Sequence, residues 1–279
     1  MRRITVNLIK EFGRRLADEE KAKATLEKYL RDIAAFLTWI ADRELNKELV
    51  LLYKQHLIEN YAPTSMNSML SSINSFFSYN KWYELKVRTL KIQKQIFARK
   101  DKELTKDEYM RLLSAASHSH NRQLYLLMQT ICATGIRVSE LRAVTAEAVK
   151  AKRAEINCKG KMRVVILPDM LCKMLLKYIK DEKITRGPVF VSKNGKPLDR
   201  SNIWRMMKNL CEAAGVSKDK VFPHALRHLF ARTYYSMEKD IVRLADILGH
   251  SSVNTTRLYT MESGEEHRRQ IQRLGLLQC

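Results

Sequence analysis

Residues 1–100 carry apolar side chains at spacings of three and four, and this pattern predicts amphipathic helices. One predicted helix has these apolar residues on a single face: Leu26, Tyr29, Leu30, Ile33, Phe36, Leu37 and Ile40. A second begins at Pro63, which suits the first turn of a helix. Its apolar face comprises Met66, Met69, Leu70, Ile73, Phe76 and Phe77. Its other face is polar but uncharged, which fits either plain hydration or hydrogen bonds to DNA phosphates.

Residues 81–100 change character, because Glu84 alone opposes a run of cations and no strong apolar period continues to the end of the run. The cations are Lys81, Lys86, Arg88, Lys91, Lys94, Arg99 and Lys100. Such a segment predicts a basic linker, either a solvated tether or a positive strap against a duplex. We therefore treat these side chains as candidate DNA contacts.

A second domain is predicted from Leu104, because Thr105 and Glu108 have the spacing of a helix-capping box. A β-hairpin is predicted farther along the chain. Its strands lie at 154–158 and 163–167, around a tight Lys-Gly-Lys turn.

Residues 189–192 have the pattern of one more short strand, and the rest of the chain is predicted to be helical, including a last helix at 265–276. The expected fold class is mainly α (α+β). We expect a helical domain at 1–95, a basic linker at 96–103, and a mixed, mostly helical domain with a small β-hairpin at 104–279.

The charge of the chain narrows the class of partner. The formal charge of +21, from 51 Lys and Arg against 30 Asp and Glu, is larger than solubility requires. Neutralised phosphates release counterions, so nucleic acid is the expected partner, and a merely adhesive basic surface is the alternative. No apolar run approaches the roughly 18 residues of a spanning helix, and the first residues are too polar for a secretory signal. We expect a cytoplasmic protein without a membrane partner.

The cysteines give no sign of a metal site. All five are widely scattered, without a C-x-x-C pair or a histidine at ligand spacing. We therefore expect reduced thiols, no metal and no cofactor.

Three residues of the second domain are candidates for binding an anion. Arg137 stands just after a glycine helix stop in apolar surroundings, where an arginine needs an anion. Two interpretations stay open for it: a structural ion pair with Glu140, or a phosphate ligand. His224 and Arg227 lie three residues apart on a predicted helix, so they project from one face.

His250 and Tyr259 stand near each other late in the chain. Taken singly, a histidine is usually structural, and a tyrosine near a helix end usually serves packing. Taken together, two arginines, two histidines, a lysine in a hairpin turn and a late tyrosine are the groups that metal-free phosphoryl transfer requires.

Four segments closely resemble the signature boxes of the tyrosine recombinases, the family that includes Xer proteins and phage integrases. They are A-T-G-I-R-V-S-E-L at 133–141, C-K-G-K at 158–161, H-A-L-R-H at 224–228 and L-G-H-S-S-V-N-T-T-R-L-Y at 248–259. The resemblance covers most of 104–265, and the helical residues before the linker look, less specifically, like the family's core-binding domain. The hairpin turn departs from the frequent G-K-G-N-K-x-R form, because it is one residue shorter and lacks the first glycine.

The resemblance implies a role for each site residue. Arg137 and Arg227 would grip the scissile phosphate with the planar fork that suits phosphate oxygens. His224 would contact the phosphate and help to take the tyrosine proton, and His250 would donate a hydrogen bond to a phosphoryl oxygen. Tyr259 would attack the phosphorus and become a covalent 3′-phosphotyrosine.

The same resemblance makes Lys159 the general acid that protonates the departing 5′ oxygen. Because the hairpin turn departs from the family form, Lys161 is the alternative. Glu140 would orient the site from behind. His228 also fits the family pattern, but it should point about a quarter turn away from Arg227, so we expect it to be structural.

The sequence therefore predicts a site-specific DNA recombinase that needs no metal, ATP or other cofactor. The resemblance implies double-stranded DNA with an inverted-repeat core site as partner, and a homo-tetramer on two such sites. The C-terminal tail would either dock on a neighbouring protomer or fold back on its own domain. The choice among integration, excision, inversion and resolution stays open, as does the participation of accessory proteins.

Two other functions compete with this prediction. A type IB topoisomerase uses similar Arg, Lys, His and Tyr chemistry to relax DNA, but the short chain and the Xer-like boxes argue against it. A catalytically silent DNA-binding accessory protein is the second, but every catalytic position of the family is filled here.

Overall fold

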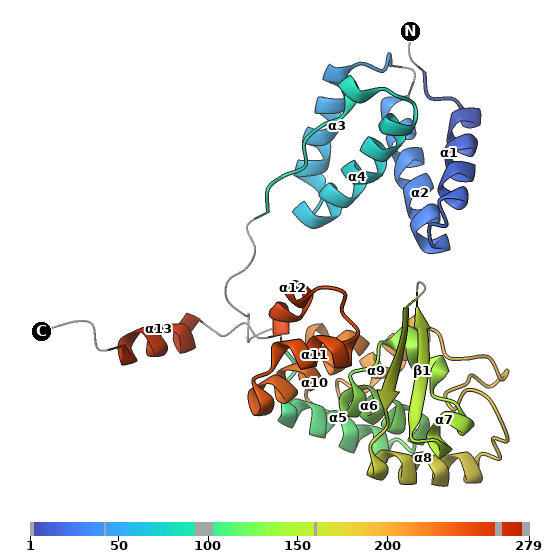
Figure 1. The fold of residues 1–279 in the computed structure, drawn as a ribbon, viewed down its shortest axis with the longest axis vertical. Coiled ribbons are helices and arrows are strands. Elements are labelled where there is room, and N and C mark those ends of the chain that lie inside the picture. The colour runs from blue at the N-terminus through green and yellow to red at the C-terminus, as the bar shows by residue number, and fades with distance from the viewer. Residues whose placement is uncertain (1–2, 42, 93–102, 159–160, 260–263, 275–279) are drawn as a thin grey trace, which may run out of the picture. The chain divides into compact units, whose positions relative to one another are not determined.

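The computed structural model describes residues 3–41, 43–92, 103–158, 161–259 and 264–274. The chain divides into two compact units, Met1–Lys94 and Gln95–Cys279, and each has its own hydrophobic core. Helices dominate both units, and the described residues contain a single two-stranded antiparallel sheet (Figure 1). The expected mainly α fold class is therefore confirmed.

The first unit is a bundle of helices. They are α1 (Val6–Asp18), α2 (Lys23–Ile40), α3 (Lys47–Asn60), α4 (Pro63–Tyr79) and the short 3₁₀ helix η1 (Tyr83–Leu85). Phe36 of α2 and Phe77 of α4, one from each predicted apolar stripe, are fully buried with ring centroids 6.0 Å apart. Both stripes therefore face one core, as their spacing predicted.

The uncharged polar face of α4 binds the segment that follows the bundle. The side-chain amide of Asn74 bonds to both the N–H (3.0 Å) and the C=O (2.8 Å) of Val87. Asn67 bonds to Leu90 in the same way, at 2.8 and 2.9 Å. Each asparagine thus substitutes for one pair of hydrogen bonds in a β-ladder.

The segment at 81–100 is predicted from the sequence to be a basic linker throughout. Its part at 85–91 is packed against the helical bundle, so for these residues the interpretation as a solvated tether was wrong. Leu85 and Val87 are buried in the first core, while Lys86, Arg88 and Lys91 are exposed. The backbone bonds to α4 hold the segment in an extended form that separates apolar from basic side chains. Three further cations named above, Lys94, Arg99 and Lys100, lie outside the described residues.

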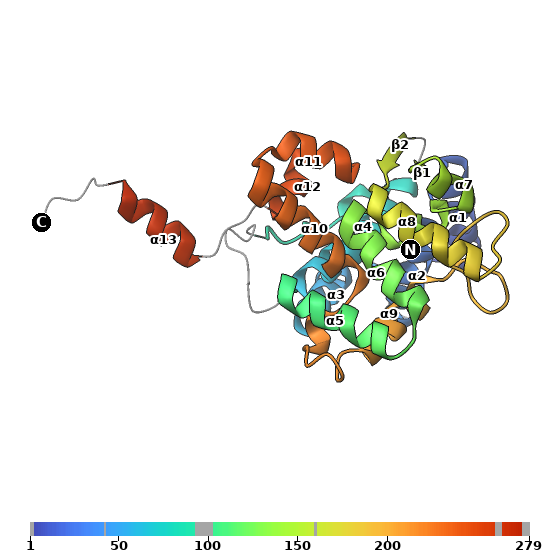
Figure 2. The ribbon, with the colours of Figure 1, turned by 90° about the horizontal axis from the view of Figure 1, so that it is seen from below.

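The second unit is built around the central helix α6, which packs against α5, α8, α9 and α10. Figure 2 shows α10, α11 and α12 gathered on one side of this unit. The helices are α5 (Lys106–His118), α6 (Arg122–Thr134), η3 (Val138–Ala143), α7 (Ala146–Lys150), α8 (Asp169–Asp181), α9 (Arg200–Asn209), η4 (Lys218–Lys220), α10 (Pro223–Glu238), α11 (Ile241–Leu248), α12 (Val253–Thr256), η5 (Arg257–Tyr259) and α13 (Gly264–Arg273).

The predicted hairpin is present, with β1 (Arg153–Cys158) paired to β2 (Lys161–Ile166). Cys158 faces Lys161 in the register, so Lys161 belongs to the strand and the turn is shorter than predicted.

The predicted strand at 189–192 is wrong. A single bridge joins Val191 to Pro197, and another joins Thr145 to Pro188. Proline has no N–H to donate, so neither bridge extends into a ladder. The capping box of Thr105 and Glu108 is present at the start of α5, as predicted. No described helix is long and apolar enough to cross a membrane.

Replacement of Asn74 by alanine should release the segment at 86–91 from α4. Two hydrogen bonds are lost and the buried Val87 amide is left without a partner, at a cost of about 2 kcal/mol. We expect peptides that cover this segment to exchange their amide hydrogens at least about tenfold faster, as measured by mass spectrometry on the whole chain. Ser71→Ala is the control, because its hydroxyl bonds only to a carbonyl of its own helix. Equal exchange in the two variants would contradict the role of Asn74.

Candidate active site

The candidate site is centred on Arg227, a guanidinium that lies inside the second unit with 1% of the residue exposed. It donates to the carbonyl of Gly135, to the carbonyl of Leu248 at 2.7 Å and to Nε2 of His250 at 3.0 Å. Its Nε is buried without a partner among the described residues. These three acceptors are neutral, and no carboxylate of the described residues pairs with it.

The acceptors of Arg227 come from the carboxyl ends of two helices. Gly135 caps α6 and Gly249, which follows Leu248, caps α11; both adopt the left-handed conformation, with φ of 64° and 63°. Helix carboxyl ends carry partial negative charge and unpaired carbonyls, which suit a buried cation. A Cβ on Gly135 would stand 2.5 Å from the ring of Phe230, so glycine is required there for close packing as well.

Arg137 is held beside Arg227 by Glu140. Its side chain pairs with Oε1 of Glu140 at 2.9 Å and donates to the carbonyl of Gly249 at 3.2 Å. Its backbone N–H bonds to Oε2 of the same carboxylate at 2.9 Å. The predicted ion pair with Glu140 is therefore present. Arg137 also stays partly exposed and lines a hollow with Arg227, and its role as a phosphate ligand stays a prediction.

Glu140 also binds Arg163, a residue of β2 that the sequence analysis did not select. Arg163 contacts the carboxylate at 2.5 Å and donates to the carbonyl of Ile247 at 2.6 Å. Its stem passes so close to Gly249 that any Cβ there would collide with it. Burial raises the pKa of Glu140, but bonds from Arg137 and Arg163 outweigh it and hold the pKa below its ordinary value of 4.5. Glu140 thus ties the hairpin to the arginines as an ionised carboxylate.

Tyr259 lies buried in η5, against two imidazoles. Its ring stacks on His250 at a centroid distance of 5.8 Å and meets His228 edge-on at 4.6 Å. His228 in turn meets His224 at 4.5 Å. His228 was expected to point away from the site, but η5 places Tyr259 against it, so this expectation of its direction was wrong.

Burial, followed by nearby positive charge, lowers the pKa of all three imidazoles and keeps the rings neutral. Burial and the nearby guanidinium of Arg227 lower the pKa of His250 to about 4, and the pKa of His224 is lowered by the same two causes. The pKa of His228 is lowered to about 4 by burial first and by His224 next. Burial and Arg137 lower the pKa of Arg227 itself to about 10, although the nearby Tyr259 acts in the other direction. The site therefore carries positive charge that a phosphate would relieve.

A hollow of about 500 Å³ opens beside these groups. Arg137, His224 and Arg227 line it, together with Arg200 and Trp204 of α9. The sequence analysis missed Arg200 and Trp204, because no motif marks them and only the packing of α9 against α10 brings them to the site. Lys159 lies outside the described residues and Lys161 begins β2, so the choice of general acid stays a prediction.

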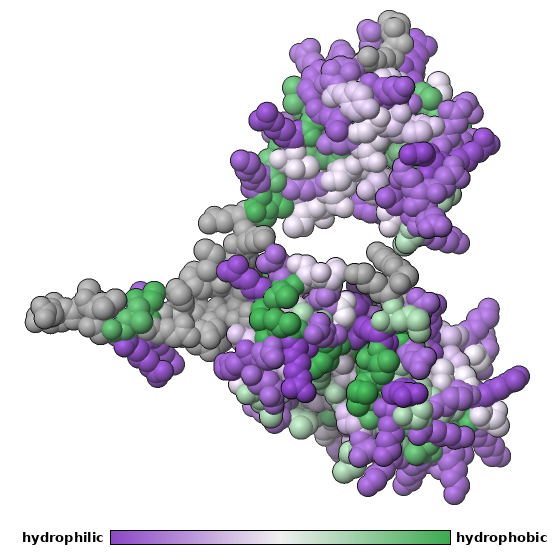
Figure 3. Space-filling view, in the orientation of Figure 1, coloured by the Kyte–Doolittle hydropathy of each residue, from purple (hydrophilic) through white to green (hydrophobic). Residues whose placement is uncertain are grey.

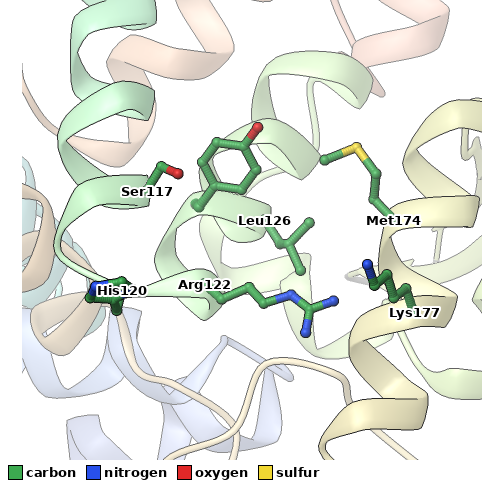
Figure 4. A pocket seen from close by; sticks show the side chains of 7 residues that line it. Ser117, His120, Arg122, Leu126, Met174 and Lys177 are labelled. Carbon is green, nitrogen blue, oxygen red and sulfur yellow. The ribbon is translucent and has the colours of Figure 1, made fainter.

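A second hollow, of about 480 Å³, lies at the opposite end of α6 (Figure 4). His120, Arg122 and Lys177 contribute to its wall, and Arg122 is already paired with Asp181 at 2.5 Å. Arg137 follows the carboxyl end of α6 and Arg122 begins the helix, so about 20 Å of helix separates the two hollows. This hollow contains none of the predicted site residues, so it is no part of the candidate site.

Replacement of Glu140 by glutamine should uncouple the hairpin from the arginines. At pH 7 we expect the free energy of unfolding to fall by about 3 kcal/mol, because two cations lose their buried counter-charge. The pKa of Glu140 is lowered by folding, so its stabilisation is present above pH 4.5 and is lost as the pH falls through the lowered pKa. Urea unfolding over a pH series should therefore show a difference in the free energy of unfolding between variant and parent that disappears at acid pH.

The matched control for this experiment is Glu155→Gln on the exposed side of β1. We expect it to change the free energy of unfolding by no more than about 0.5 kcal/mol at any pH. If the loss of unfolding free energy in Glu140→Gln stays constant down to acid pH, the ion pairs of an ionised Glu140 with Arg137 and Arg163 would be refuted.

Comparison with known proteins follows the same two units. Residues 102–266 match the model of the phage integrase family, and residues 9–84 match the phage integrase N-terminal SAM-like domain. Tyrosine recombinase XerD of Vibrio cholerae is 28% identical over 261 residues, which cover 86% of each chain. Tyrosine recombinase XerA of Thermococcus kodakarensis is 29% identical over 281 residues, which cover 97% of this chain and 96% of that one.

Solved structures have the same fold. The crystal structure of XerA recombinase is 25% identical, with a TM-score of 0.53 over 98% of this chain and 99% of that one. A lambda integrase (75–356) dimer bound to a COC′ core site has a TM-score of 0.74 at 20% identity, over 93% and 96% of the two chains. Family model, relatives and fold agree with the resemblance seen in the sequence boxes: this chain belongs to the phage integrase family, the family of the tyrosine recombinases.

Proposed function

We propose that the chain is a site-specific DNA recombinase that cleaves and rejoins strands through a 3′-phosphotyrosine at Tyr259. One observation carries the proposal: Arg227 donates a hydrogen bond to His250, on whose ring Tyr259 stacks, next to a hollow that Arg137 also lines. Nucleophile, imidazole and cation are thus in one cluster of contacts. The relatives, which are named tyrosine recombinases, support the same reaction.

Arg137 and Arg227 are the proposed clamp for the scissile phosphate. Arg227 donates to neutral acceptors, two backbone carbonyls and His250, and Arg137 donates to the neutral carbonyl of Gly249 besides its ion pair with Glu140. A phosphate oxygen is a stronger, charged acceptor, so it would replace the weaker of these bonds. Once the phosphate is bound, the same groups would neutralise the charge that develops in the transition state.

Tyr259 is the proposed nucleophile. Its oxygen forms a bond to phosphorus while the bond from phosphorus to the 5′ oxygen breaks. His224 takes the phenolic proton, and its lowered pKa keeps the ring neutral and able to accept. Lys159, or Lys161 as the alternative, gives a proton to the leaving 5′ oxygen. A 5′ hydroxyl of the partner duplex then attacks the phosphotyrosine and reverses the step on a new strand.

Duplex DNA with an inverted-repeat core site is the proposed substrate. The first unit would be the core-binding domain (1–95), residues 96–103 the linker and 104–279 the catalytic domain. The bonds from α4 to the segment at 86–91 support a DNA role for Lys86, Arg88 and Lys91, because they hold these cations outward. Lys81 is exposed as well. A DNA substrate also agrees with the cytoplasmic location that the sequence predicts.

A tetramer on two DNA sites is the proposed assembly, with α13 as the link between neighbours. Ile271 and Leu274 are 54% and 63% exposed, and Figure 3 shows that α13 has both an apolar and a polar side. An apolar groove of about 310 Å³ lies in the second unit, lined by Tyr109, Met110, Cys132, Leu229, Phe230 and Met237 among others. We propose that this groove receives α13 of the next copy, a head-to-tail contact that closes into a ring.

The reaction is tested by trapping the adduct. The protein is mixed with sheared DNA from its own genomic neighbourhood and denatured with detergent, and fragments that remain attached are sequenced. We expect recovery at one inverted-repeat site with the parent and none with Tyr259→Phe. Arg137→Ala should lower single-turnover cleavage of the recovered duplex about 100- to 1000-fold and keep most of the affinity, because the basic surface remains.

Other results would contradict the proposal. Adducts spread evenly over the DNA would indicate a topoisomerase. Equal recovery with Tyr259→Phe would exclude Tyr259 as the nucleophile. If no adduct forms even on a nicked duplex that cannot reseal, the silent DNA-binding protein would be the better account.

The assembly is tested by placing a charge on α13. Ile271→Asp should reduce the fraction of four-copy complexes on the recovered duplex at least about tenfold, as counted by mass photometry, because the aspartate cannot enter an apolar groove. Binding of one copy to one half-site should not change. Gln272→Asp, on the same helix, adds the same charge and should assemble normally. If both variants assemble like the parent, α13 is not the link.

A further inference from the structure

Thr256 is a buried threonine that the proposed reaction does not yet use. It ends α12 and is 0% exposed. Its Oγ1 lies 2.8 Å from Nδ1 of His250. A hydroxyl without a partner in such a place would be costly, so the contact is a genuine hydrogen bond.

The direction of this bond follows from the other nitrogen of the ring. Nε2 of His250 lies 3.0 Å from the guanidinium of Arg227, which can only donate. Nε2 therefore accepts and has no proton. The neutral ring must then carry its proton on Nδ1, and Nδ1 donates it to Oγ1 of Thr256.

The proposed reaction needs the opposite arrangement. A phosphoryl oxygen only accepts hydrogen bonds, so His250 can bind it through Nε2 only when Nε2 carries a proton. At the same time Arg227 would turn its own N–H from His250 to the phosphate. A neutral ring that gains a proton on Nε2 has none left on Nδ1, and Nδ1 then needs a donor in place of an acceptor.

We propose that Thr256 is the positioning residue that lets His250 change tautomer when the phosphate binds. Its hydroxyl accepts from Nδ1 in the free site and donates to Nδ1 in the bound site. In the exchange Nδ1 loses one proton to water and Nε2 takes one from water, so the charge of the ring is unchanged. The inference rests on the proposed function, because it presumes that His250 contacts the scissile phosphate.

A threonine suits this task because its hydroxyl can rotate. It is both donor and acceptor, whereas a carboxylate would only accept and an ammonium would only donate. Thr256 also lies in the same short segment as Tyr259, whose ring stacks on the ring of His250. The bond from Thr256 therefore helps to hold the imidazole against the proposed nucleophile.

The first test is the tautomer itself. Two-bond ¹H–¹⁵N correlation spectra of the whole protein should show His250 protonated on Nδ1 in the absence of DNA. With Tyr259→Phe bound to the recovered duplex, the proton should appear on Nε2. A free protein with the proton on Nε2, or a bound one that keeps it on Nδ1 alone, would overturn the proposal. The measurement on free protein stands even if no adduct ever forms, so it separates this inference from the proposed function.

The second test uses three variants. Thr256→Val keeps the shape and removes the hydroxyl, so single-turnover cleavage should fall about 10- to 100-fold, the range for loss of a group that orients a functional histidine. DNA affinity should stay unchanged. Thr256→Ser keeps the hydroxyl and should restore most of the rate. Thr255→Val, the same change at the exposed neighbour, should behave like the parent.

A purely structural role would give another pattern. If Thr256 served packing alone, Thr256→Val, which keeps the shape, would cleave like the parent, and Thr256→Ser, which lacks the methyl group, would be the impaired variant. Equal rates for Thr256→Val and the parent would also refute the proposal. If Thr256→Val does not fold, the spectra of the parent and of Thr256→Ser still show which nitrogen of His250 carries the proton, and so test the proposal.

Discussion

The structure of the second unit depends on keeping the charge of Arg227 inside the protein. A buried guanidinium must find acceptors, and here the carboxyl ends of α6 and α11 supply them through Gly135 and Leu248. Three helices must therefore meet at one point, and a glycine must cap each of the two that end there. Because no carboxylate in the described part of the chain neutralises Arg227, its charge stays available to an anion.

A second layer of contacts extends from this centre. Glu140 joins Arg137 to Arg163, and Arg163 reaches the end of α11 from the hairpin. The hairpin, the loop after α6 and the last turn of α11 thus share one set of bonds. Burial and the nearby cations keep the imidazoles neutral, so in the proposed reaction they can accept or pass a proton while the arginines hold the charge. Binding and proton transfer would then be divided between two kinds of side chain.

The sequence predicted those parts that depend on local pattern. Helical stripes, the capping box and the hairpin follow from spacing, and the family boxes named the residues that gather around Arg227. Arg163, Arg200 and Thr256 were missed because only tertiary contacts bring them to the site. The segment at 86–91 was misread because asparagine side chains, which periodicity does not register, bind its backbone. The segment at 189–192 has apolar residues in the right places for a strand, but its one bridge partner is Pro197.

The central claim is that the cluster around Arg227 exists to activate Tyr259 against a phosphate. The most direct measurement is mass spectrometry of the trapped complex after nuclease and protease digestion, which locates the attached nucleotide on one residue. The account predicts a 3′-nucleotide mass on Tyr259 and on no other residue. A nucleotide on another side chain, or cleaved DNA that ends in a free 3′ phosphate with no attached protein, would contradict it.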